Sequence, residues 1–239
     1  MKRRLLSALH VAGLLLLLAM PVLAQPQGDL DRLLQQSLKA YGGEERLSRL
    51  STLRAQGRIT VKGQADAGRV ERLFQAPDRL SSLTVYGAGT GEKRLLVKDR
   101  AWRNGQPASV PEHIAMSLQA ARLRLPLLLK ENRAHLIDQG LQEKGGRRFY
   151  GVTLPVSEGI SLFVAIDAAS GLILQTNGTL ALADGTKAEF TTLYGDYRFI
   201  EGIAVALRED HYVQGAHTGT TVLEQVEINR PLPSGAFTP

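Results

Sequence analysis

The sequence contains no cysteine, and this absence removes several classes of exported protein from consideration. A chain without cysteine has no disulfide framework, no thiol nucleophile and no cysteine metal site. Aromatic residues are also scarce, with one Trp, six Phe and six Tyr among 239 residues. We therefore expect aliphatic side chains to line any apolar cavity in this protein.

Long apolar runs are absent after the N-terminus, where one short run has the pattern of a secretory signal. Residues 2–4 are basic, residues 11–20 are apolar with five consecutive leucines, and residues 22–24 end on the small residue that precedes a cleavage site. Pro21 interrupts the run before it is long enough to span a bilayer. We expect cleavage after residue 24 and release of the remaining chain into the periplasm, because no cysteine follows that could be acylated.

The positive charge is smaller than the whole sequence suggests. The formal net charge is +6, and removal of the three basic residues at positions 2–4 lowers it to +3. Such a balance gives little support for nucleic-acid binding. We expect residues 25–239 to form one globular domain that buries a core. A eukaryotic secretory signal is the alternative, and Asn177-Gly178-Thr179 would then be a glycosylation sequon.

Helical periodicity comes first along the chain. Leucines at helical spacing predict a helix over residues 29–40 with Asp29 as its N-cap, and Gly42-Gly43 ends it. A shorter helical turn is expected over residues 44–50. A second helical segment is expected from Pro111 to about Asp138, kinked or divided at Pro126.

Alternation of polar and apolar residues predicts that the rest of the chain is a meander of antiparallel strands. Turns are expected where glycine, proline, asparagine or aspartate gather, including 87–91, 104–105, 167–171 and 183–185. The expected strands cover residues 58–62, 80–86, 93–102 as a hairpin, 147–154, 162–166, 172–176, 179–183, 187–193, 197–200, 204–213 and 220–229.

Several ordered stretches resemble the outer-membrane lipoprotein-sorting-like (LolA/LolB-like) proteins. They are Tyr41-Gly42-Gly43-Glu44 with residues 50–57 and 75–80 near the start, then residues 163–173, 195–203 and 226–233. The resemblance implies a mostly β fold with helices (α+β). That fold is an incomplete antiparallel β-barrel, with an N-terminal helix and a mid-chain helical insertion covering its concave face. It also implies that the concave face receives acyl chains, although this chain has few aromatic residues for a cavity lined by rings.

The alternating apolar residues of the strands and the apolar residues of the insertion are the candidates for contact with a lipid. The same side chains would equally form a closed core, and the insertion is either a lid on bound lipid or a packed helix. The candidates are Ile59, Val61, Leu83, Val85, Trp102, Ile114, Met116, Leu118, Leu125, Leu128, Leu162, Val164 and Ile166.

Catalytic and metal patterns are weak. Neighbours in a strand point to opposite faces, so Asp210 and His211 should not share one ligand, and we expect His113, His135, His211 and His217 to be surface residues. The glycines of residues 87–91 lack the lysine and the following helix of a phosphate loop. The basic residues of the insertion are interpreted as a solvated face, with anionic head groups or an acidic partner as the alternative. They are Arg122, Arg124, Lys130 and Arg133.

These observations favour a non-catalytic periplasmic carrier or binding protein for a lipid or an acylated protein, without metal or other cofactor and without nucleic acid. We expect a monomer that makes transient contact with a membrane or a membrane-bound partner. An accessory protein-interaction domain with a self-filled barrel and no lipid cargo is the alternative. A continuous apolar void of several hundred Å³ would distinguish the two, because ligand sites generally have that size.

Overall fold

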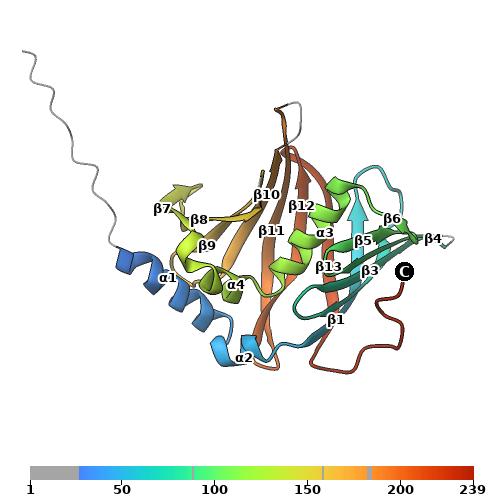
Figure 1. Cartoon of the computed structure of the whole chain (residues 1–239), viewed down its shortest axis with the longest axis horizontal. Coiled ribbons are helices and arrows are strands. Elements are labelled where there is room, and N and C mark those ends of the chain that lie inside the picture. Colours follow the sequence, from blue (N-terminus) through green and yellow to red (C-terminus); the bar gives the residue numbers. More distant parts are fainter. Residues whose placement is uncertain (1–26, 88, 158, 182–184) are drawn as a thin grey trace, which may run out of the picture.

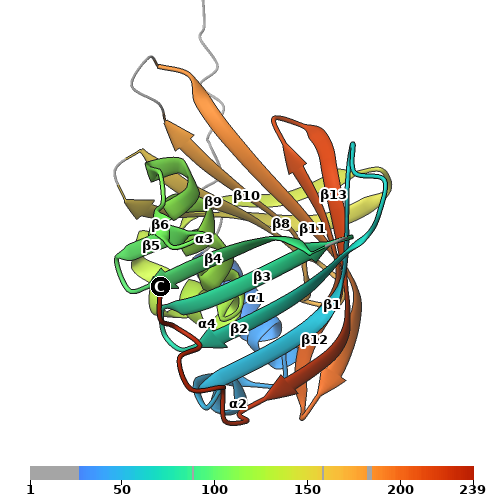
Figure 2. The same ribbon diagram turned by 90° about the vertical axis from the view of Figure 1, so that its right-hand side faces the viewer.

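The computed structural model describes residues 27–87, 89–157, 159–181 and 185–239. The expected signal segment and part of the turn at residues 183–185 lie outside these described residues. Within them, one antiparallel sheet of 13 strands has the order β6-β5-β4-β3-β2-β1-β13-β12-β11-β10-β9-β8-β7. Its first and last strands, β6 and β7, are not paired with each other, so the sheet curls without closing (Figures 1 and 2).

Four α-helices accompany this sheet in the described part of the chain, and all strands except β6 are at least four residues long. The helices are α1 (Gln27–Ala40), α2 (Glu44–Ser48), α3 (Val110–Arg122) and α4 (Leu125–Glu131). The strands are β1 (Thr52–Val61), β2 (Gly68–Gln75), β3 (Arg79–Tyr86), β4 (Thr90–Val97), β5 (Arg100–Arg103), β6 (Gln106–Pro107), β7 (Ile137–Lys144), β8 (Arg147–Ser157), β9 (Ile160–Asp167), β10 (Ile173–Ala181), β11 (Lys187–Ile200), β12 (Ile203–Val213) and β13 (Ala216–Ile228).

The mid-chain helical segment differs from its expected length. It divides at residues 123–124, and Pro126 lies in the first turn of α4, where its missing N–H removes no hydrogen bond. The prediction of helix to about Asp138 is wrong, because α4 ends at Glu131 and Ile137 begins β7. At the end of α4 the Asn132 side-chain amide donates to the Leu128 carbonyl at 2.9 Å, which satisfies one of the last helical acceptors.

Several expected strands are longer than predicted because a glycine inside a strand does not end it. The segments expected at 172–176 and 179–183 belong to the one strand β10 as far as Ala181, where the described range ends, and those at 187–193 and 197–200 form β11. A register shift near Ile173 bends β10 without breaking its pairing with β9. Asp29 lies in the first turn of α1 rather than at the N-cap.

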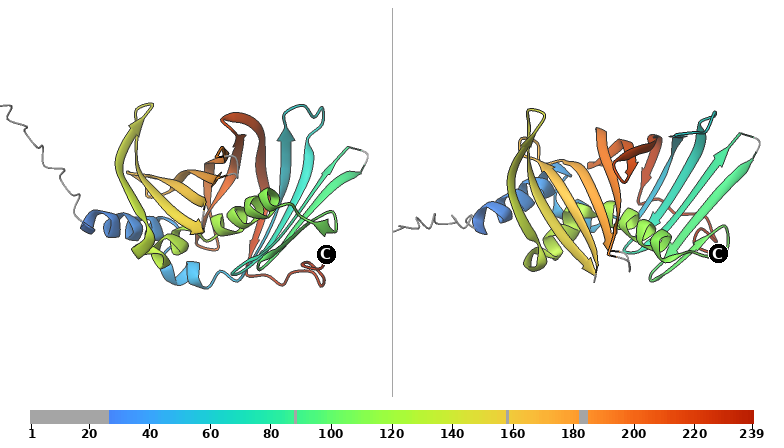
Figure 3. Two further views of the ribbon diagram at one scale, coloured as in Figure 1. Left: turned by 45° about the horizontal axis from the view of Figure 1, so that its top comes forward. Right: turned by 90° about the horizontal axis from the view of Figure 1, so that it is seen from above.

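Helix α3 crosses the concave face and packs against both halves of the sheet (Figure 3). Ile114 and Leu118 join the buried cluster of α1 and β8–β10, whereas Met116 and Ala120 join the cluster of β1–β4. A Cβ atom on Gly178 of β10 would lie 2.4 Å from Leu118 Cδ1, so glycine at this position permits the close approach of the helix. The helix therefore roofs the curled sheet.

Candidate functional site

A cavity of about 650 Å³ lies between α3 and the concave faces of β1–β3 and β11–β13. Val213 lines it and is 40% exposed, so the cavity reaches the surface near the end of β12. Leu47, Leu50 and Ile228 line its other end and are almost completely buried. Its volume is in the range of ordinary ligand sites, so the self-filled barrel does not describe this part of the molecule.

The other part of the concave face is filled by the protein's own side chains. Leu162, Val164 and Ile166 of β9 have no exposed surface and pack with leucines of α1 and α4. Their alternation does place them on the concave face, but the helices cover that face completely here. These three lipid-contact candidates therefore lie in closed core and do not line the cavity.

The structure brings five of the remaining candidates to the cavity wall: Ile59, Val61, Met116, Leu118 and Leu125. Ile114 and Leu128 belong to the core cluster around α1 and do not line the cavity.

Three candidates lie on the convex face. Thr84 and Tyr86 line the cavity, so the alternate residues of β3, Leu83 and Val85, point the other way, and Leu83 is 39% exposed. Trp102 pairs with Leu95 of β4. The residues on either side of Leu95 face the concave side, since Arg94 lines the cavity and Leu96 packs in the core, so Leu95 and Trp102 lie on the convex face. Both sets of alternate positions in β3 mix polar and apolar residues, so alternation alone does not decide which set faces the cavity.

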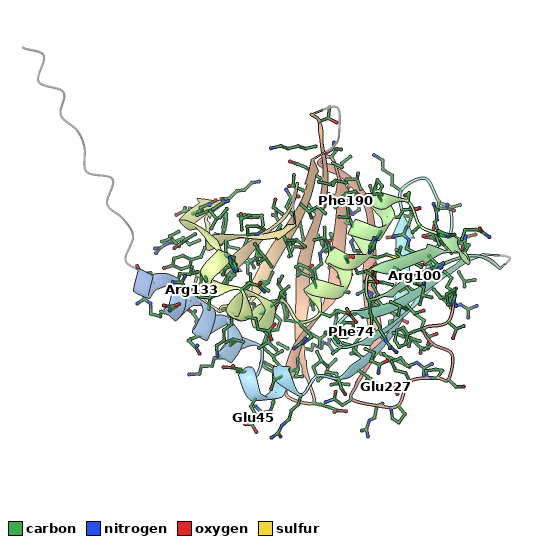
Figure 4. All side chains as sticks on the ribbon, viewed as in Figure 1. Glu45, Phe74, Arg100, Arg133, Phe190 and Glu227 are labelled. Carbon is green, nitrogen blue, oxygen red and sulfur yellow. The ribbon has the colours of Figure 1, made fainter. Side chains whose placement is uncertain are left out.

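Aromatic rings contribute more to the cavity than the composition predicts. Five of the six tyrosines line it, together with Phe190, which Figure 4 shows beside the upper part of α3. Aliphatic residues such as Leu53, Val70 and Ile203 still form most of the apolar lining, as expected, but the fold also concentrates the small aromatic supply at this one place. The tyrosines are Tyr41, Tyr86, Tyr194, Tyr197 and Tyr212.

Two of these tyrosines form a fixed pair at the buried end of the cavity. The Tyr41 and Tyr197 hydroxyls lie 2.8 Å apart, and Tyr197 Oη donates to the Ile173 carbonyl at 2.7 Å. Their rings meet edge to face at a centroid distance of 5.8 Å. Burial raises the pKa of Tyr41, so both hydroxyls remain protonated and this wall is uncharged.

A buried ion pair lines the cavity. Arg72 Nη1 and Nη2 each donate to a carboxylate oxygen of Glu209 at 2.9 Å, and the side chains are only 4% and 12% exposed. With its amide oxygen turned toward Arg72, Gln119 of α3 accepts from Nε and Nη2 at 3.1 Å each. Burial raises the pKa of Glu209, but the Arg72 guanidinium overcomes this and holds that pKa at about 2. Glu209 is therefore charged at neutral pH.

His211 lies on the same wall and differs from its expected surface position. Its Nε2 is 3.0 Å from the Thr221 hydroxyl, and Nδ1 is 3.5 Å from the Thr192 hydroxyl. Burial, together with Arg72 and Arg122, lowers the pKa of His211 below its ordinary value, so the ring is neutral at pH 7. Asp210 faces the opposite side and pairs with Arg208, as strand alternation predicts.

Three of the four basic residues of the insertion have acidic partners outside the cavity. Lys130 pairs with Glu44 of α2, Arg133 pairs with Asp31 of α1, and Arg124 lies 3.8 Å from Glu131. Arg122 alone among the four lines the cavity, where its Nη1 donates to the Thr192 hydroxyl at 3.1 Å. The interpretation of the insertion as a solvated basic face is thus incorrect for Arg122.

Arg72, Glu209 and the strand that carries Arg72 were not predicted from the sequence. Strand β2 was not among the expected strands because charged residues stand on both of its faces, which hides the alternation. The available signal was Arg72 between Val70 and Phe74, an arginine on what is otherwise the apolar face. Within the described ranges, no group of three or more His, Asp or Glu residues is placed to hold a metal ion. No helix in the same ranges is long and apolar enough to cross a membrane.

Known structures share this fold. A LolA superfamily protein from Nitrosomonas europaea superposes with a TM-score of 0.57 and 13% identity over 87% of this chain and 97% of that one. A domain named as an outer membrane lipoprotein-sorting protein from Vibrio parahaemolyticus gives a TM-score of 0.50 and 11% identity over 87% and 95%. A DUF1329 family protein from Desulfovibrio piger gives a TM-score of 0.50 and 8% identity over 87% of this chain and 96% of that one.

No family model matches the sequence, and no curated protein matches it. At identities of 8% to 13% the likeness to these structures establishes the fold. The expected LolA/LolB-like architecture, an incomplete antiparallel barrel with an N-terminal helix and a helical insertion over its concave face, is confirmed. Fold alone does not assign a function, so the function has to be argued from the cavity.

Proposed function

We propose that this protein is a non-catalytic periplasmic carrier that holds the acyl chain of a lipid or an acylated protein in the cavity under α3. The single observation that carries the proposal is the 650 Å³ cavity, enclosed at one end by buried apolar residues and open at the other. Burial of apolar surface drives such binding at roughly 25 cal/mol per Å². The signal-like N-terminus supports the periplasmic location, with residues 25–239 as the mature domain.

The enclosed end offers the larger apolar contact to an acyl chain. Leu50, Leu53 and Ile203 line it together with the partly buried Val205. A chain entering past Val213 would pass Phe190 and reach this end through the space below α3. Shape and apolarity, rather than a reactive group, distinguish this proposal from an enzyme.

The test compares two small-to-large variants with lipid retention as the readout. Val205→Trp should fill the enclosed end, whereas Val222→Trp places the same ring on the convex face, where Val222 is 37% exposed. The proteins are purified from a periplasmic fraction, examined by native mass spectrometry and then extracted for lipid. We expect bound lipid in the wild type and in Val222→Trp, and its loss in Val205→Trp.

Circular dichroism and a thermal melt establish that both variants are folded, because overpacking can itself destabilise a protein. A folded Val205→Trp protein that retains the wild-type lipid would contradict an acyl chain at this end. N-terminal sequencing of the same material tests the export step, with a start at Gln25 expected.

A further inference from the structure

Arg122 is a cation inside the cavity that has no carboxylate partner among the described residues. It is the last residue of α3, and its only hydrogen bond there is from Nη1 to the Thr192 hydroxyl at 3.1 Å. Its Nε is buried and has no hydrogen-bond partner in the same part of the chain. Leaving a buried donor of a charged group without a hydrogen-bond partner costs free energy. The described part of the fold provides no such partner for Arg122 Nε.

The other charges of the cavity wall compensate one another. The described residues that line the cavity include four arginines and three glutamates. Glu209 takes two hydrogen bonds from Arg72. At the rim, Glu92 pairs with Arg94 and Arg103, and Glu112 pairs with Arg103. Arg122 is left as the excess positive charge.

The groups around Arg122 that are not already in an ion pair are hydroxyls and a neutral ring. Thr192 and Thr221 offer hydroxyls, and the neutral ring of His211 lies between them with one N–H to donate. Glu209 is close enough to interact electrostatically with both Arg122 and His211, but each of its carboxylate oxygens already accepts a hydrogen bond from Arg72. A planar guanidinium beside hydroxyl donors is well suited to a carboxylate or phosphate, which it binds through two parallel hydrogen bonds.

We propose that Arg122 binds the anionic head group of the acyl ligand, a carboxylate or a phosphate monoester, with its acyl chain in the enclosed end of the cavity. The inference rests on the proposed function and adds the chemical class of the ligand to it. It places the head group at the middle of the cavity, beside Thr192 and His211, and the chain toward Leu53 and Ile203. The bound anion neutralises the one excess charge of the wall.

The test titrates delipidated protein with ligands that share one chain and differ in the head. Laurate and dodecyl phosphate carry an anion, dodecan-1-ol has the same chain without charge, and acetate has the charge without the chain. We expect the wild type to bind laurate or dodecyl phosphate at least about tenfold more tightly than dodecan-1-ol, the strength of a hydrogen bond to a charged group. Acetate should bind far more weakly.

The variant Arg122→Gln should lose about tenfold or more for the anionic ligands and stay within about twofold for dodecan-1-ol. The control Arg124→Gln removes a charge at the same end of α3 from a residue that does not line the cavity, and should change neither. Arg122→Lys keeps the charge without the planar fork, and should fall between wild type and Arg122→Gln. If Arg122→Gln does not fold, the Arg122→Lys series and the wild-type comparison carry the test.

Three results would overturn the inference in distinguishable ways. Equal wild-type affinity for laurate, dodecyl phosphate and dodecan-1-ol would leave the carrier proposal standing and remove the head-group site. An equal loss for charged and uncharged ligands in Arg122→Gln would assign Arg122 a packing role. Absence of binding for every acyl ligand would remove the carrier proposal together with this site, and acetate as strong as laurate would indicate an anion site without an acyl ligand.

Discussion

The Arg72 guanidinium on β2 and the Glu209 carboxylate on β12 form two hydrogen bonds of 2.9 Å each, although β1 and β13 lie between their strands. On a flat sheet, strands three places apart are separated by roughly 14 Å, at about 4.8 Å per strand. The two side chains reach each other because the sheet curls around the cavity and brings the two strands closer than they would be on a flat sheet. The ion pair thus lies across the concave face and contacts the roof through Gln119.

Removal of one partner of this pair should be strongly destabilising. Arg72→Met leaves the Glu209 carboxylate buried without a cation, and we expect a loss of about 3 to 5 kcal/mol in the free energy of unfolding. The double variant Arg72→Met/Glu209→Leu should recover much of that loss, because it buries no unpaired charge. Urea denaturation of the two single variants and the double variant measures the coupling.

The matched control is Arg54→Met on the convex face. Arg54 pairs with Glu71 at 2.9 Å, but the two side chains are 38% and 30% exposed, so solvent screens the pair. We expect a loss of about 1 kcal/mol or less for the control. If Arg72→Met costs no more than Arg54→Met, the concave pair does not stabilise the fold as argued.

Acid should weaken the fold through Glu209. Its pKa in the folded protein is about 2, below the ordinary value of 4.5. A carboxyl with a lowered folded-state pKa stabilises the protein above its unfolded pKa and loses that contribution as the pH falls toward the folded value. We expect the free energy of unfolding to fall by up to about 3 kcal/mol from this group between pH 5 and pH 2.

The measurement is the free energy of unfolding against pH for wild type and for Arg72→Met/Glu209→Leu. The pKa values of Asp167 and Asp210 are lowered as well, because hydrogen bonds and arginines outweigh the effect of burial, which raises them. Both proteins therefore lose stability in acid. The wild type should lose more, and the difference between the two curves is the contribution of the pair. Parallel curves would show that Glu209 is not held ionised by Arg72.

Helix α3 and the start of α4 should act as a packed roof in the free protein. Leu118 and Leu125 are almost completely buried and join the same core cluster, in contact with residues of α1 and β8–β10. Truncation of each to Ala should cost about 2 to 5 kcal/mol whether or not ligand is bound, because each leaves a cavity in the core. Chemical denaturation of delipidated Leu118→Ala/Leu125→Ala against delipidated wild type measures the sum.

A loss above about 4 kcal/mol for the double variant supports the packed roof over a mobile lid. Val110→Ala on the same helix is the control, since Val110 is 70% exposed and its truncation should change stability by about 0.5 kcal/mol or less. A small loss for the double variant combined with weaker lipid retention would instead indicate a lid.

Local patterns in the sequence determined the elements of this protein and its fold class. Leucines at helical spacing gave α1, alternation gave most strands, and Pro126 marked the division between α3 and α4. These features depend on residues close in sequence, so their periodicity is visible without the structure. Glycines inside β10 and β11 misled only the boundaries, because pairing with two neighbouring strands holds such a strand together.

Only the tertiary structure decided which part of the concave face is hollow. Val164 and Val61 both lie in strands with alternating polar and apolar residues. Val164 is buried beneath α1 and α4, whereas Val61 lines the cavity. Arg72 and Glu209 are 137 positions apart in the chain, and their ion pair exists only because the sheet curls. Periodicity indicates which residues share a face of one element. The cavity, the ion pair and the excess charge of Arg122 depend instead on how elements distant in sequence pack against one another.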